Sequence, residues 1–107
     1  MTASEFVRLC KSEKESLLAE YFESDPQSAV GAKIANLRPT KTQSRLVREI
    51  VDGVLTDAFY TILLGLDGCA SIGGRQVNYR LKDEEGNLFT GSGEIESAAF
   101  EEFHSSE

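Results

Sequence analysis

Tryptophan is missing from this chain, and cysteine and histidine are scarce: the 107 residues include two Cys and one His. Cys10 and Cys69 lie too far apart in sequence for a metal-binding knuckle, and His104 alone cannot complete a zinc set. We therefore expect no metal site. Because reduced cysteine behaves as a small apolar residue, we expect two buried free thiols; a disulfide would fit only an exported protein.

Long hydrophobic runs are also absent. The longest, Ile62–Leu66, is far shorter than the roughly 20 apolar residues of a membrane-spanning helix. The first residues lack the basic and apolar segments of a signal peptide. The length, with 40% hydrophobic and 27% charged residues, is typical of one folded domain, residues 1–107. We expect a cytoplasmic protein with no membrane partner.

Lysine and arginine are absent from the last 25 positions, residues 83–107, which carry eight acidic side chains. The first 82 residues hold eleven bases and ten acids, so the net charge of −7 is concentrated at the C-terminal end. A domain polarised in this way attracts cationic surfaces and repels nucleic acid. The candidate partner-binding residues are Asp83, Glu84, Glu85, Glu94, Glu96, Glu101 and Glu102.

Capping signals predict shorter helices in the N-terminal third. A turn or two is expected over residues 4–10, and Ser12 with Glu15 fits a capping box that opens a clearer helix. The pair Asp25–Pro26 predicts the next helix, which would run to about Leu37. The expected buried residues of these helices are Leu17, Leu18, Tyr21, Phe22, Val30, Ile34 and Leu37.

A long central helix is predicted next. Thr40 and Gln43 fit a capping box, and apolar residues then recur at helical spacing for about six turns, until Gly68. A stripe this wide is typical of a helix that other elements wrap. The stripe comprises Leu46, Val47, Ile50, Val51, Val54, Leu55, Ala58, Phe59, Ile62, Leu63 and Leu66.

A β-hairpin is predicted after the central helix. Residues 75–82 alternate between apolar and polar side chains, which indicates a strand with one face toward the core. Residues 83–86 suit a type I turn with Gly86 in the left-handed region, and residues 87–90 return as a second strand. The inward face of the first strand would consist of Val77, Tyr79 and Leu81.

A terminal helix over residues 94–104 completes the predicted fold, and it would bury Ile95, Ala98, Ala99 and Phe103. The sequence thus predicts an α+β class. We expect a single domain with a long central helix, shorter N-terminal helices, a C-terminal β-hairpin and a terminal helix.

No pattern of catalytic residues stands out. The glycine-rich stretch 65–74 ends a helix and precedes a strand, whereas a phosphate loop opens a helix. Asp52 and Asp57 lie about 140° apart around the helix axis, so their carboxylates do not converge. We expect no enzyme and no cofactor. An enzyme using Asp57, Asp67 and Tyr79 would need a cleft that gathers those groups.

Three basic residues of the same chain could pair with the acidic residues. Lys41, Arg45 and Arg48 share one face at the start of the central helix, where the helix dipole disfavours cations. Neutralisation by the chain's own C-terminal acids and attraction of an external cationic partner both remain open. Three bases cannot neutralise eight acids, so some negative surface is expected to remain.

Two blocks resemble small acidic bacterial immunity proteins of toxin–immunity systems. The first is residues 55–68 (LTDAFYTILLGLDG) with 71–74 (SIGG), and the second is residues 79–104, with its DEEGN turn and GEIE segment. Together they cover about the second half of the chain. The resemblance implies a cytosolic, non-enzymatic protein that occludes one cognate toxin domain, and it identifies no functional residues.

Two functions follow as hypotheses. The first is an immunity or inhibitor protein whose acidic hairpin turn and last helix face a basic toxin surface. The second is a structural or regulatory homodimeric bacterial domain without catalytic activity, joined through helix or hairpin edges. A monomer or a homodimer is compatible with the first.

Overall fold

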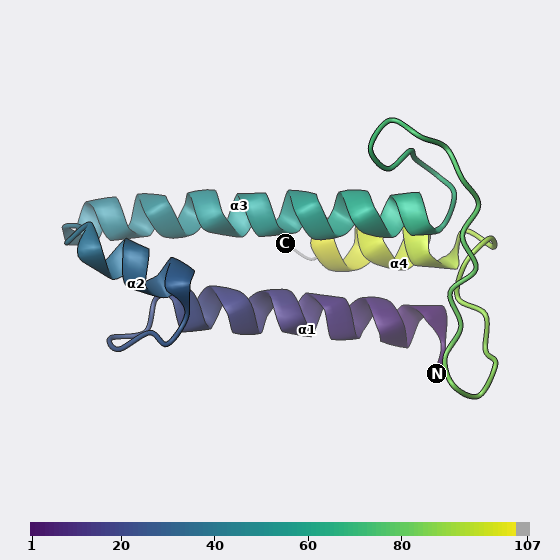
Figure 1. Ribbon diagram of the computed structural model, residues 1–107, viewed down its shortest axis with the longest axis horizontal. Coiled ribbons are helices and arrows are strands. Elements are labelled where there is room, and N and C mark those ends of the chain that lie inside the picture. Colours follow the sequence, from purple (N-terminus) through teal and green to yellow (C-terminus); the bar gives the residue numbers. More distant parts are fainter. Residues whose placement is uncertain (105–107) are drawn as a thin grey trace.

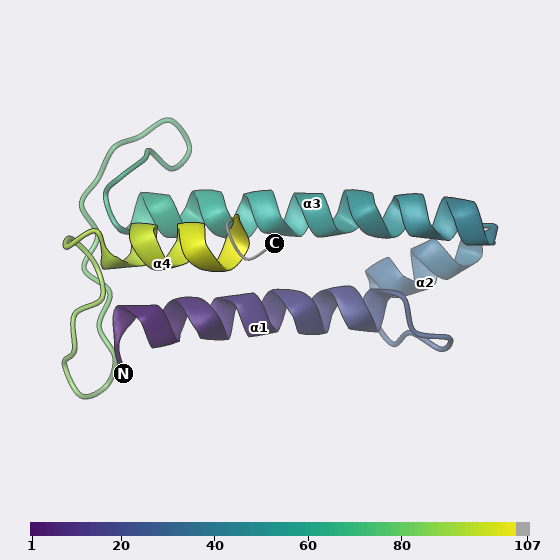
Figure 2. The same ribbon diagram turned by 180° about the vertical axis from the view of Figure 1, so that it is seen from behind.

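A computed structural model describes residues 1–104 and shows four helices. They are α1 (Ala3–Tyr21), α2 (Ala29–Asn36), α3 (Lys41–Leu66) and α4 (Glu94–Phe103). The two long helices, α1 and α3, lie side by side along a molecule of 46 × 29 × 26 Å (Figure 1). α2 joins them at one end. At the other end α4 packs on both, and the loop between α3 and α4 closes that end (Figure 2).

The first helix is continuous, so the predicted break before Ser12 is wrong. Thr2 caps α1 by accepting a hydrogen bond from the backbone N–H of Glu5, at 3.1 Å. No glycine or proline lies within the nineteen residues of α1, and nothing therefore interrupts the helix at the capping-box sequence.

The second helix begins later than the pair 25–26 predicts. Ser28 is its N-cap and accepts a hydrogen bond from the backbone N–H of Gly31, at 3.0 Å. Pro26 instead packs beneath Gly31, where an added Cβ would lie 2.4 Å from the Pro26 Cβ. The Glu20 carboxylate, at the end of α1, fixes this connection by accepting from the N–H groups of Gln27 (2.6 Å) and Ser28 (3.3 Å).

The central helix has the predicted ends but not the predicted surroundings. Thr40 and Gln43 form the reciprocal capping box, and Gly68, at φ 78°, follows the C-terminus as expected. The expectation that other elements wrap α3 is wrong, because part of its apolar stripe remains exposed. Several large apolar residues predicted to be buried are exposed: Leu46, Ile50, Val54 and Ile62 on α3, with Val30 and Leu37 at α2.

The α+β class is wrong, because residues 1–104 contain no strand. Between α3 and α4 the predicted hairpin is a loop with an isolated bridge from Lys82 to Leu88. The Thr90 hydroxyl replaces ladder bonds: it accepts from Leu81 N–H (3.2 Å) and donates to the Tyr79 carbonyl (2.6 Å). A short two-stranded hairpin is marginal in water. Here two backbone hydrogen bonds, from Phe89 N–H to the Leu81 carbonyl (2.9 Å) and from Asp83 N–H to the Asn87 carbonyl (3.1 Å), hold the segment together with Thr90 but form no regular ladder. Of the predicted inward face, Val77 and Tyr79 are each 37% exposed, whereas Leu81 packs against the core.

The core lies where α1, α3 and α4 meet. The predicted buried face of α4 is confirmed, and Val7 of α1 is completely buried against it. Two stacked ring pairs join the elements: Phe6 with Phe89 and Phe59 with Phe103. The buried cluster comprises Ala3, Val7, Leu63, Phe89, Ile95, Ala98, Ala99 and Phe103.

Candidate functional site

Asp67 fixes the position of the acidic helix α4. Its carboxylate is buried, and it accepts hydrogen bonds from the backbone N–H groups of Gly91 (2.7 Å) and Glu96 (3.1 Å). The N-cap residue of α4 is Gly93, at φ 84°, which has no side chain to cap the helix. Asp67 therefore supplies from the end of α3 the negative charge that a helix N-terminus favours.

Lys11 of α1 holds the other end of α4. Its ammonium donates to the backbone carbonyl of Glu102 at 2.5 Å and lies 5.5 Å from the centre of the Phe103 ring. A cation at the carbonyl end of a helix is favoured by the helix dipole. Both ends of α4 are thus held by charged groups from other helices, so the helix has a fixed orientation.

Asp83 organises the predicted acidic turn. Its carboxylate accepts from the backbone N–H groups of Glu85 (3.0 Å) and Asn87 (2.9 Å), and from the Asn87 side-chain amide (2.8 Å). These hydrogen bonds, those from Asn87 foremost, lower the pKa of Asp83 to about 2. The amino group of Met1 also lies 3.3 Å away. Asp83 is therefore a structural residue, and Gly86, at φ 88°, adopts the predicted left-handed conformation.

The other predicted partner-binding residues lie at the same end of the molecule. Glu84 and Glu85 are exposed on the turn, and Glu94, Glu96 and Glu101 are exposed on α4, whereas Glu102 is half-buried. Residues 67–104 carry eight acids and three bases, a net charge of −5, against −1 for residues 1–66. The structure thus confines most of the negative charge to the α4 end.

The three bases of α3 lie away from that end. Lys41, Arg45 and Arg48 occupy its first two turns, whereas α4 packs on the C-terminal half, where Phe103 stacks on Phe59 (Figure 1). Eleven residues separate Arg48 from Phe59, about 16 Å along the helix. Arg48 instead lies over the Phe22 ring, 5.4 Å from its centre.

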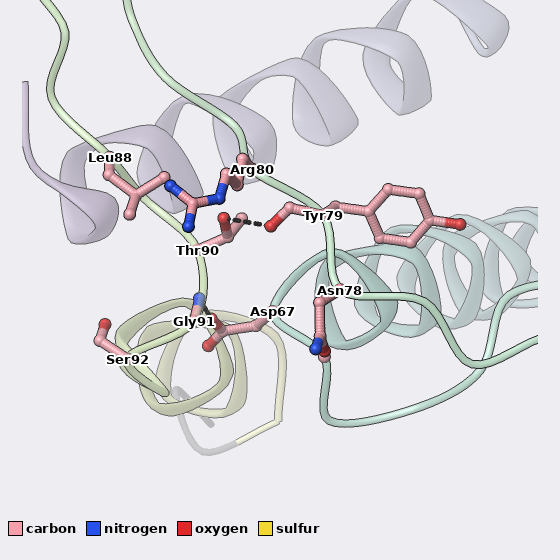
Figure 3. Close-up of a pocket in the computed structure, with 9 residues that line it drawn as sticks. Asp67, Asn78, Tyr79, Arg80, Leu88, Thr90, Gly91 and Ser92 are labelled. Carbon is pink, nitrogen blue, oxygen red and sulfur yellow. Dashed lines mark hydrogen bonds between the residues drawn. The ribbon is translucent and has the colours of Figure 1, made fainter.

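A polar pocket of about 590 Å³ tests the enzyme hypothesis. It brings together Asp67 and Tyr79, but Asp57 does not line it. Both carboxylate oxygens of Asp67 already accept backbone hydrogen bonds, and the Tyr79 ring points away from Asp67 (Figure 3). The pocket therefore provides no free carboxylate beside a phenol for acid–base chemistry. Its lining residues are Asp67, Gly68, Asn78, Tyr79, Arg80, Leu88, Thr90, Gly91 and Ser92.

The thiols differ from the prediction of two buried groups, because Cys69 is exposed and Cys10 is half-buried. A hydrogen bond to the Glu96 carboxylate, with smaller effects of desolvation and of the Glu96 and Asp67 charges, raises the pKa of Cys69 to about 11. Burial raises the pKa of Cys10. A thiol held protonated in this way is a poor nucleophile at neutral pH.

Sequence reasoning missed the residues that position the acidic surface. Asp67 and Lys11 act on backbone groups 24 to 91 positions away in the chain, and no local pattern indicates such partners. No sequence pattern indicated the hydrogen-bonding role of the Thr90 hydroxyl either. The one available hint was Gly93 before α4, since a helix that begins at glycine lacks its own capping side chain.

Among the described residues, no three His, Cys, Asp or Glu side chains gather as a metal site, and no helix is long and apolar enough to cross a membrane. Comparison of the chain with protein-family models, curated proteins and solved structures found no match.

Proposed function

We propose that this protein is an immunity-type inhibitor that binds a cationic domain of a bacterial toxin through its acidic end. The observation that carries the proposal is the concentration of exposed carboxylates on one fixed frame. Glu84 and Glu85 lie on a turn held by Asp83, and Glu94 and Glu96 lie on a helix held by Asp67. The acidic surface is defined here as these four glutamates with Glu101.

A fixed acidic surface suits recognition of a basic protein. Complementary charge accelerates the encounter of two proteins and disfavours wrong partners. Binding also costs little conformational entropy when the charged side chains lie on rigid elements. The surface acts by occlusion and requires no cofactor. Its place of action is the cytoplasm of the bacterium that makes the toxin.

The test is co-expression with the product of the adjacent gene. The two proteins should co-purify, and this protein should protect cells from that product. The variant Glu84→Lys/Glu85→Lys changes two exposed side chains of the turn. It should slow association roughly 10-fold or more at low salt, with a smaller effect at high salt.

The matched control is Glu23→Lys/Asp25→Lys, which makes the same charge change on exposed residues at the opposite end of the molecule. It should leave association nearly unchanged. If both double variants slow association equally, binding follows net charge and the assigned surface is wrong. If the adjacent gene product neither binds nor is inhibited, the proposed function is wrong.

A further inference from the structure

Phe100 lies on the outer face of the acidic helix α4 and is 54% exposed. It follows Ile95 by five positions, about 140° around the helix axis, and Ile95 is completely buried. The Phe100 side chain therefore points away from the core that holds the helix. The ring is presented to solvent on the same helix as three glutamates of the acidic surface.

The other five phenylalanines are engaged inside the fold. They form two stacked ring pairs and one contact with a cation: Phe6 with Phe89, Phe59 with Phe103, and Phe22 with Arg48. Residues 1–104 contain all six phenylalanines, and Phe100 is the one that the fold leaves exposed. A single exposed apolar residue is ordinary, so the surroundings of Phe100 decide what its ring can bind.

Two further rings connect Phe100 to the rest of the molecule. Its ring centre lies 6.2 Å from that of His104, one helical turn later. His104 in turn meets Tyr60 of α3 edge to face, with ring centres 4.3 Å apart and ring planes at 90°. This row of three rings positions the exposed ring in the free protein. A side chain that is already positioned loses little conformational entropy on binding.

Carboxylates flank Phe100 on both sides. Glu96 lies one turn before it and about 40° around the axis, whereas Glu101 follows it at about 100° in the other direction. Both glutamates are exposed. No Lys or Arg follows Lys82 in the sequence, so α4 itself supplies no cation to this ring. An exposed ring between two carboxylates is suited to a cation from outside.

An arginine side chain fits this arrangement best. Its planar guanidinium stacks on an aromatic face and can donate to a neighbouring carboxylate at the same time, which a lysine ammonium does less well. From these observations we propose that Phe100 is the aromatic anchor of the acidic surface, on which an arginine of the partner stacks between Glu96 and Glu101. The identity of that partner rests on the proposed toxin binding, whereas the ring site can be tested without the toxin.

A blocked tetra-arginine peptide is the probe for the ring site. Added to the full chain at low salt, it should shift the ring and amide NMR resonances of Phe100 in a saturable way. Phe100→Leu keeps an exposed apolar side chain but removes the ring. It should weaken peptide binding roughly 2- to 5-fold, the typical contribution of an exposed cation–π contact. Tetra-lysine should bind the wild-type protein more weakly than tetra-arginine.

The matched control for the peptide is Leu46→Ala, which alters another exposed apolar side chain, 49% exposed, at the far end of α3. It should bind tetra-arginine like wild type, and circular dichroism should show that both variants keep the helical fold. If Phe100→Leu binds the peptide as tightly as wild type, the peptide follows net charge alone and the ring site is wrong.

The complex with the adjacent gene product tests the partner's arginine. Phe100→Leu should weaken that complex roughly 30-fold, because the cation–π contact is desolvated there, whereas Phe100→Tyr keeps the ring and should bind like wild type. If Phe100→Leu binds as tightly as Phe100→Tyr and only Phe100→Ala is weaker, the contact is apolar and the arginine is wrong. If the adjacent gene product does not bind while the peptide does, the proposed function fails and the ring site stands.

Discussion

The Asp67 carboxylate, at the C-terminal end of α3, accepts a hydrogen bond from the backbone N–H of Glu96 in the first turn of α4, at 3.1 Å. Its second oxygen accepts from Gly91 N–H at 2.7 Å. A buried carboxylate is costly unless such donors face it, and the first N–H groups of a helix need such an acceptor. One side chain at the end of α3 thus caps the first turn of α4 and fixes the loop that precedes it.

Asp67→Ala should destabilise the fold by about 1–3 kcal/mol, since it leaves two buried N–H groups without acceptors. Asp67→Asn should cost less than that, because it keeps one acceptor oxygen, although its amide faces a donor. Urea unfolding followed by circular dichroism measures both. The control is Asp57→Ala, an exposed aspartate of the same helix, which should change stability by less than about 0.5 kcal/mol. Equal losses of stability in Asp67→Ala and Asp57→Ala would show that Asp67 does not hold the start of α4.

Asp83 should make the free energy of unfolding depend on pH in the acid range. Its pKa is about 2 in the folded protein, below the ordinary 3.8, so the unfolded chain binds more protons between these values. The stabilisation it contributes is therefore present above about pH 4 and is lost as the pH falls toward 2. Asp83→Asn should reduce this part of the pH dependence, measured as the urea midpoint from pH 2 to 6. A direct NMR titration giving an ordinary pKa for Asp83 would contradict the proposed turn geometry.

Lys14 and Asp52 should make non-additive contributions to the stability of the fold. Lys14 is 5% exposed and its ammonium contacts the Asp52 carboxylate across α1 and α3, with Glu15 at 3.7 Å. Asp52→Ala leaves a buried cation with one weaker partner, whereas Lys14→Met removes the charge and keeps the apolar stem. The first change should therefore cost more than the second. Because Asp52 is half-exposed, we expect a coupling of roughly 1 kcal/mol in a double-mutant cycle. Additive single effects would show that the pair is not coupled.

The sequence carried enough information for the parts of the fold that local chemistry decides. The Thr40–Gln43 capping box, the stop at Gly68 and the buried face of α4 were predicted correctly because each depends on neighbouring residues. Residues 75–90 have the alternation of a strand, but tertiary contacts decide their structure. Thr90 is buried and satisfies backbone groups there, and of the apolar side chains Leu81 and Phe89 pack toward the core.

The sequence showed which acidic residues cluster, but not which of them hold the structure and which face solvent. The acids that cluster along the chain also lie at one end of the molecule. This clustering could not separate Asp83, whose oxygens hold a turn, from Glu84 and Glu85, whose side chains are exposed. The apolar stripe of α3 indicated how much apolar surface the helix carries, but not which of its residues the rest of the chain leaves exposed.

Cys69 should react slowly for an exposed thiol. With a pKa of about 11 instead of 9.0, its thiolate fraction at pH 8 falls roughly 100-fold, and alkylation by iodoacetamide depends on the thiolate. The measurement is the labelling rate of the Cys10→Ala variant, folded against urea-unfolded. Glu96→Gln should accelerate labelling of the folded protein, because it removes the carboxylate that holds the proton. The matched control is Glu94→Gln, at the first residue of the same helix. If the folded Cys10→Ala variant were labelled at the unfolded rate, Glu96 would not hold the thiol proton.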